Sequence, residues 1–208
     1  MGFSTQIEAE RHFEPKTRKN RRILRPKPLP SLGRLKSISD FFKSYPLGGE
    51  REALCVQPTT LELIQTLFDC GAMDLTVPDP ENEFVQVAKK SIPEHVILRK
   101  ARGPSIFDLR TNRGFDLWCD PGFMFLQTDE AFQYAYTKEL KKRLRFGGYA
   151  VLGFDYLEKG SAFSPLEMSA TLGLYFELHA IVDAPVSLGK SVRLAIFKRW
   201  VGSSGRKR

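Results

Sequence analysis

Long apolar runs, disulfide patterns and targeting segments are missing from this chain of 208 residues. No run of apolar residues approaches the roughly 18 residues that are needed to cross a bilayer. The first fourteen residues contain acidic residues and no hydrophobic signal region, so neither a secretory signal nor a transit peptide is expected. The three cysteines are widely separated, and no CxxC or HxxxH spacing suggests a zinc site. We therefore expect reduced thiols in a cytoplasmic or nuclear protein that is neither secreted nor transmembrane.

Familiar catalytic motifs are absent as well. The sequence has no GxGxxG, GxxxxGK[ST], HExxH or GxSxG pattern. Its three histidines, His12, His95 and His179, lie far apart in the sequence. The best acid–base arrangement puts Glu177 and His179 on one face of a strand, with Asp155 on a neighbouring strand. We expect no enzymatic activity, no cofactor and no metal, and an acid–base enzyme built around His179 is a less favoured alternative.

What the sequence does contain is positive charge at both of its ends. The formal net charge is +8. Residues 1–36 hold ten Lys or Arg and three acids, and residues 190–208 hold seven Lys or Arg and no acid. The remaining residues are net acidic, and four prolines between residues 15 and 30 disfavour regular structure in the first segment. This distribution is typical of a globular body with basic arms that contact a polyanion.

Basic residues in three segments are the candidate nucleic-acid contacts. They are Arg18, Lys19, Arg21, Arg22, Arg25, Lys27, Arg34 and Lys36 in the first arm, Lys141, Lys142, Arg143 and Arg145 at the end of a predicted helix, and Arg206, Lys207 and Arg208 in the tail. RNA is the favoured partner, since extended basic segments neutralise successive phosphates. An anionic membrane surface is the alternative target, and the run at 18–22 is also typical of a nuclear import signal.

Period-two alternation dominates residues 167–183, where even positions are apolar and odd positions are mostly polar. The pattern predicts one long strand, with a bulge near Gly173 because glycine inside a strand often marks one. Residues rich in β-branched and aromatic types predict further strands at 84–88, 95–99, 105–110, 115–120, 149–156 and 192–200. The strands 149–156, 167–183 and 192–200 are expected to form an antiparallel meander.

Helical spacing of apolar residues predicts helices at 59–72 and 128–145, and a short helix at 37–45. Thr59 with Glu62 has the spacing of a capping box, and Gly71 is expected to end that helix. Thr128 is expected to cap the second helix, and Gly147 and Gly148 to end it. The acidic stretch 74–83 is expected to be a solvated turn.

These patterns together predict an α+β fold: a mainly antiparallel sheet of about six strands, two covering helices and a disordered basic N-terminal arm. The predicted organisation is a flexible arm at 1–36, one globular domain at 37–202 and a basic tail at 203–208. We expect a non-enzymatic, self-associating protein whose arms bind RNA, with a layout similar to that of small viral coat or matrix proteins. A virion is then a third location, and a cellular RNA- or ribosome-associated protein is the main alternative.

Overall fold

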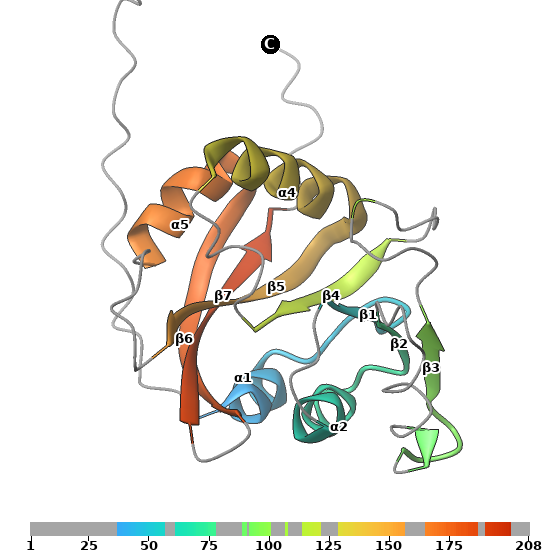
Figure 1. Cartoon of the computed structure of the whole chain (residues 1–208). Coiled ribbons are helices and arrows are strands. Elements are labelled where there is room, and N and C mark those ends of the chain that lie inside the picture. Colours follow the sequence, from blue (N-terminus) through green and yellow to red (C-terminus); the bar gives the residue numbers. More distant parts are fainter. Residues whose placement is uncertain are drawn as a thin grey trace, which may run out of the picture. The chain divides into compact units, whose positions relative to one another are not determined.

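Seven strands and four α-helices make up the described part of the chain (Figure 1). The computed structural model describes residues 37–56, 61–77, 89–90, 92–100, 107, 114–121, 129–156, 165–186 and 190–200. The strands are β1 (Glu52–Cys55), β2 (Asp74–Val77), β3 (Ile97–Lys100), β4 (Phe115–Asp120), β5 (Leu144–Tyr156), β6 (Phe176–Val186) and β7 (Lys190–Arg199). The helices are α1 (Ile38–Ser44), α2 (Leu61–Asp69), α4 (Glu130–Arg143), α5 (Pro165–Leu172) and a 3-10 turn, η2 (Gly173–Tyr175). Within these ranges, no helix has the length and apolar character needed to span a membrane.

The strands form one mixed sheet in the order β3-β2-β1-β4-β5-β7-β6. Neighbours from β3 to β5 are parallel, whereas β7 is antiparallel to both β5 and β6. Helices α1 and α2 pack on one face of this sheet, and α4 and α5 pack on the other (Figure 1). The prediction of a mainly antiparallel sheet of about six strands with two helices is therefore wrong, because most of the sheet is parallel and is covered on both faces.

The short parallel strands β1 and β2 account for most of this error. Each has four residues, and all four residues of β1 are buried. Strands that are covered on both faces lack the polar–apolar alternation by which strands are recognised in a sequence. Strand β2 falls in the acidic stretch 74–83 that was expected to be a solvated turn. The predicted strands 95–99 and 115–120 correspond to β3 and β4, while 84–88 lies outside the described residues, as does 105–110 apart from Phe107.

Helices α1 and α2 close one face of the sheet. Phe41 and Phe42 of α1 are almost fully buried, and their ring centroids lie 5.4 Å and 5.6 Å from that of Tyr149 on β5. Burial of one such side chain contributes about 1.5–3 kcal/mol. Helix α2 confirms the predicted helix 59–72 with shorter bounds, and Gly71 follows it at φ +100. Thr59 lies outside the described residues.

Helix α4 confirms the predicted helix 128–145 and covers the other face. Asp129 is its N-cap, and its side chain accepts a hydrogen bond of 2.9 Å from the Ala131 backbone N–H. Tyr136 and Leu140 point into the core. The helix ends at Arg143 and β5 begins at Leu144, so Gly147 and Gly148 belong to the strand and do not end the helix.

The predicted long strand 167–183 is instead a helix, a 3-10 turn and a strand. Met168 and Leu172 lie one helical turn apart in α5, and both are buried, so their even numbering fits a helix as well as a strand. Strand β6 begins at Phe176 and pairs with β7, which lies between β5 and β6. The register shifts between Leu178 and Ala180, and residues before and after this bulge enter cores on opposite faces. No single apolar face therefore extends along the segment.

Candidate functional site at the carboxyl edge of the sheet

The chain order of the sheet reverses between β1 and β4. From β1 the strands β2 and β3 follow on one side, whereas β4 and β5 lie on the other side. In open α/β sheets, ligands bind beyond the carboxyl ends of the strands at such a reversal. The Val56 N–H, just after β1, donates a hydrogen bond of 2.8 Å to the carbonyl oxygen of Cys119 on β4. Val56, Asp120 and Pro121 therefore form the described part of this candidate site.

A buried hydrogen-bonded chain fixes the last side chain of β4. Trp118 Nε1 donates to the hydroxyl of Tyr136 at 2.8 Å, and that hydroxyl donates to Oδ2 of Asp120 at 2.8 Å. All three side chains are fully buried, with exposed fractions of 0%. Tyr136 comes from α4, so the helix that follows β4 in the chain holds the carboxylate at the edge.

Burial and the nearby Asp120 raise the pKa of Tyr136 well above its ordinary value. The hydroxyl therefore stays protonated at neutral pH and serves as a donor to the carboxylate. A carboxylate held in one place accepts hydrogen bonds from the amino or hydroxyl groups of a ligand. Sequence reasoning missed Asp120; the available signal was an acid at the end of a buried strand, followed by proline and glycine.

Burial disfavours the reactive thiolate form of Cys119 and Cys70. Cys55 and Cys119 are paired in register across β1 and β4, and all three cysteines are free and buried; their redox state stays a prediction. A hydrogen bond with Cys55, together with burial, raises the pKa of Cys119. Burial raises the pKa of Cys70 to about 12. Thiols that remain protonated are poor nucleophiles and metal ligands, and the described residues contain no cluster of acids, His and Cys suited to a metal ion.

His179 lies on β6, away from this edge. Its Nε2 is 3.9 Å from Oε2 of Glu177, as expected for one strand face. Burial lowers the pKa of His179, and Lys198 adds to this effect while Glu177 opposes it. Asp155 is on β5, which β7 separates from β6, and it is paired in register with Arg193. The structure therefore does not assemble the acid–base group of His179, Glu177 and Asp155.

The predicted nucleic-acid contacts of the two arms, at 1–36 and 201–208, lie outside the described residues. Of the other four, Lys142 and Arg143 both contact Glu139, at 3.7 Å and 2.7 Å. Arg143 is 7% exposed, so its side chain is largely unavailable to a polyanion. Lys141 lies over the ring of Tyr175, and Arg145 belongs to an ion network. The four cations thus do not form the single patch expected from their order, and their contact with nucleic acid stays a prediction.

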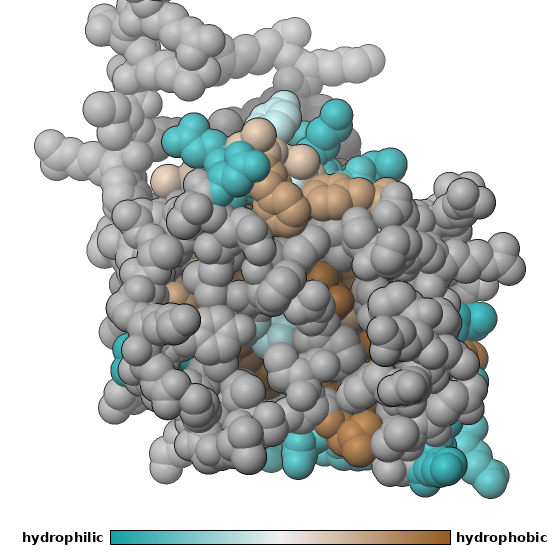
Figure 2. All heavy atoms as spheres, in the orientation of Figure 1, coloured by the Kyte–Doolittle hydropathy of each residue, from teal (hydrophilic) through white to brown (hydrophobic). Residues whose placement is uncertain are grey.

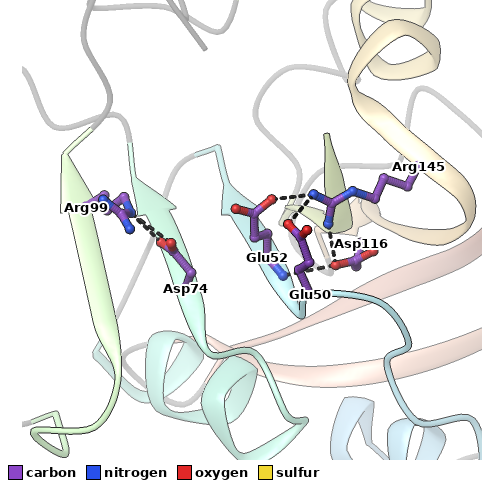
Figure 3. Close-up of polar contacts among 6 residues, drawn as sticks. All are labelled: Glu50, Glu52, Asp74, Arg99, Asp116 and Arg145. Carbon is purple, nitrogen blue, oxygen red and sulfur yellow. Dashed lines mark hydrogen bonds and ion pairs between the residues drawn. The ribbon is translucent and has the colours of Figure 1, made fainter. Parts of the chain in front are cut away.

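Arg145 ties together the amino ends of β1, β4 and β5 (Figure 3). Its Nη1 lies 2.8 Å from Asp116, and its Nη2 lies 2.6 Å from Glu52 and 2.8 Å from Glu50. The backbone N–H of Glu52 also donates to Asp116, at 3.1 Å. Gly49, at φ +68, leaves room for this group, because an added Cβ would lie 2.6 Å from Asp116 Oδ1. The network is at the end of the sheet opposite the candidate site.

No protein-family model matches this sequence, and no curated protein sequence matches it significantly. Solved structures do match. The N-methyltransferase NodS from Bradyrhizobium japonicum is 19% identical, with a TM-score of 0.56 over 78% of this chain and 94% of that one. An S-adenosylmethionine-dependent methyltransferase from Clostridium acetobutylicum is 13% identical, with a TM-score of 0.52 over 78% and 90%. An rRNA methylase from Streptococcus thermophilus is 9% identical, with a TM-score of 0.55 over 78% and 94%.

These similarities establish the fold, which is a Rossmann-like methyltransferase fold. They contradict the expectation of a non-enzymatic viral structural protein, whether capsid or matrix, because the similar structures are those of methyltransferases. The sequence contains no motif that points to this fold, and the parallel strands β1 and β2, which complete the sheet, were not predicted.

Proposed function

We propose that this chain is a methyltransferase whose reaction takes place beyond the carboxyl ends of β1 and β4. The observation that carries the proposal is the strand order β3-β2-β1-β4-β5-β7-β6 with β7 antiparallel. Its overlay on structures described as S-adenosylmethionine-dependent methyltransferases supports the same reaction type. One fold hosts more than one function, so the side chains at the reversal must also fit the reaction.

The described side chains at this edge suit an adenosine-containing methyl donor. Val56 and Pro121 are buried apolar residues beside the fixed carboxylate of Asp120. An adenosine has a flat base and several amino and hydroxyl donors, so these three residues would hold it by packing and by hydrogen bonds. When bound, S-adenosylmethionine supplies an electrophilic methyl group on its sulfonium. One departure stands out: residues 56–60 read VQPTT, without the glycines that dinucleotide-binding folds place in this turn.

For the methyl acceptor we propose RNA. The basic ends of the chain hold 17 of its 32 Lys and Arg residues, an arrangement suited to phosphate contacts. One of the similar structures is described as an rRNA methylase, which supports the same choice. The arms supply affinity without base specificity, and the edge of the sheet places the acceptor.

Calorimetric titration with S-adenosylhomocysteine, followed by transfer of a tritiated methyl group from S-adenosylmethionine to RNA, tests this proposal. We expect binding by the wild type and an Asp120→Asn variant weaker by about 10- to 100-fold, since hydrogen bonds to charged groups contribute about 1.5–3 kcal/mol. Glu177→Gln makes the same chemical change at an exposed site and should leave binding unchanged. A folded wild type that neither binds the cofactor product nor transfers a methyl group to RNA would rule the proposal out.

A further inference from the structure

A groove of about 730 Å³ lies between α4 and the α5–η2 segment, on the surface of the molecule. Its α4 side includes Tyr134, Thr137, Lys138 and Lys141, and its other side includes Tyr175. Figure 2 shows hydrophilic and moderately hydrophobic residues next to one another at the top of the view, where α4 lies in Figure 1. The groove is thus neither a purely apolar helix face nor a purely charged one.

The residues on α4 follow the axis of the helix. Glu130, Tyr134, Lys138 and Lys141 are separated by three or four positions, so they share one helix face. At about 1.5 Å per residue, the stripe extends for about 16 Å, much longer than a single phosphate group. Helix α4 connects the carboxyl end of β4 to the amino end of β5, so the Glu130 end lies toward the candidate methyl-transfer edge.

Two cations of the groove are not neutralised. Within the described residues, neither Lys138 nor Lys141 has a carboxylate at ion-pair distance. By contrast, the neighbouring Lys142 and Arg143 both form ion pairs with Glu139. The cations that hold the helix in place and the cations that face the groove are therefore different residues, and the latter remain available for phosphate groups.

Two exposed aromatic rings accompany these cations. Tyr134 is 74% exposed and Tyr175 is 47% exposed, and Nζ of Lys141 lies 3.3 Å from the centroid of the Tyr175 ring. The contact with Lys141 also lowers the pKa of Tyr175. Exposed rings alternating with cations are the features with which proteins stack bases and neutralise phosphates of single strands.

We propose that this groove binds single-stranded RNA. Lys138 and Lys141 contact phosphates, and Tyr134 and Tyr175 stack on bases. The positive charge and the aromatic rings favour a nucleic acid over an acidic peptide, which offers anions but no flat base to stack. The choice of RNA rests on the proposed function, and the direction of the groove leads the strand toward the methyl-transfer edge.

Fluorescence anisotropy with a short labelled single-stranded RNA, measured on the full chain at several salt concentrations, tests the groove. We expect the double variant Lys138→Gln/Lys141→Gln to flatten the log–log salt slope by about 1.4, at about 0.7 per lost contact. The Tyr134→Ala variant should weaken binding by about 5- to 150-fold through the loss of one stacked base. Its ring is mostly exposed, so folding should not be affected.

Matched controls remove the same groups elsewhere. Lys43→Gln/Lys90→Gln removes two charges from exposed positions outside the candidate contacts, and Tyr45→Ala removes a ring near α1. Equal changes in RNA affinity for the groove variants and the control variants would overturn the inference. It would also be overturned if the groove residues affected the binding of a labelled acidic peptide but not that of RNA. Methyl transfer is measured separately. A flatter salt slope in the groove variants without methyl transfer by the wild type would support RNA binding in the groove and contradict the proposed methyltransferase activity. Methyl transfer by the wild type with an unchanged salt slope in the groove variants would support the activity and contradict RNA binding in the groove.

Discussion

Strand β4 carries a buried aspartate at each of its ends, and the two are held in opposite ways. Asp116, at the amino end, pairs with the guanidinium of Arg145, which also pairs with Glu52 and Glu50 (Figure 3). Asp120, at the carboxyl end, accepts a hydrogen bond from the neutral hydroxyl of Tyr136. The ion pair between Asp116 and Arg145 connects β4 to β5. A carboxylate that accepts a hydrogen bond from Tyr136 is fixed in space by the helix that covers it.

The largest effect on stability should come from the amino end. Arg145→Gln leaves Glu52 and Asp116, each with a 9% exposed side chain, close together without their cation. We expect a loss of about 3 kcal/mol, at the lower end of the range for broken buried pairs because Arg145 is partly exposed. Urea denaturation followed by circular dichroism measures this change.

Arg99→Gln provides the matched control for that prediction. Arg99 lies 2.8 Å from Asp74 at the same edge, and its side chain is 45% exposed (Figure 3). Exposed pairs contribute at most about 1 kcal/mol. If the two arginine variants were equally stable, the Arg145 network would not be the connection between β1, β4 and β5 that we describe.

The second effect, at the carboxyl end, should be smaller and independent of pH. Tyr136→Phe removes the donor to Asp120 and the acceptor of the Trp118 N–H, and we expect a loss of about 2 kcal/mol. Because the pKa of Tyr136 is raised, its hydroxyl stays protonated and the loss should be constant between pH 6 and 8. Tyr134→Phe on the exposed face of the same helix should not change the free energy of unfolding. A loss of stability in that control would show that any tyrosine substitution in α4 destabilises the protein.

His179 provides a third, weaker effect that belongs to neither end. Its pKa is lowered mainly by burial; Glu177 and Lys198 are the charged groups near it, and Tyr149 is a ring neighbour at 6.2 Å. The unfolded chain therefore binds a proton more readily than the folded one, so stability falls as the pH drops through about 6.5 toward the lowered pKa. Urea midpoints between pH 5 and 8 should show this slope in the wild type and lose it in His179→Gln. The same slope in both proteins would assign it to other groups.

The smallest effect should be spectroscopic only. Lys141→Gln removes the cation over the Tyr175 ring, so the pKa of Tyr175 should rise toward its ordinary value of about 10. Ultraviolet titration of tyrosinate, compared with a Tyr175→Phe variant to assign the signal, measures the shift. Lys142→Gln is the control, because that lysine contacts Glu139 and not the ring. Neither lysine variant should be less stable than the wild type, in contrast to the variants at the two ends of β4.

Sequence reasoning was accurate where a residue pattern has only one structural solution. The helices α1, α2 and α4 and the strands β5 and β7 were predicted, since their periodicities or caps are unambiguous. Strand β1 was missed because its four buried residues have no readable period. Strand β2 alternates, but over only four residues inside an acidic stretch that resembles a turn. In the segment 167–183, spacings of four residues fit a helix and a strand equally well, and the bulge at His179 is invisible in a two-residue alternation.

The candidate site was not predictable for a related reason. Asp120 becomes meaningful only after β1 and β4 are known to be neighbours, because the reversal of strand order marks the edge. The helical spacing of apolar residues that predicts α4 does not indicate that the hydroxyl of Tyr136 holds a carboxylate. A basic arm is visible in any composition count, and for that reason it received more weight than one acid after a strand.

The direct junction of α4 and β5 restricts how this chain can vary in length. Helix α4 ends at Arg143 and the strand starts at Leu144, with no residue between them to absorb an insertion or a deletion. One residue added at this junction would move Leu144 and Arg145 out of line with Phe115 and Asp116. Residues 145–148 differ, because the register between β4 and β5 already shifts there and a bulge absorbs extra residues. Homologous sequences should therefore align without gaps from the second half of α4 to Arg145, and changes in length should fall in 146–148.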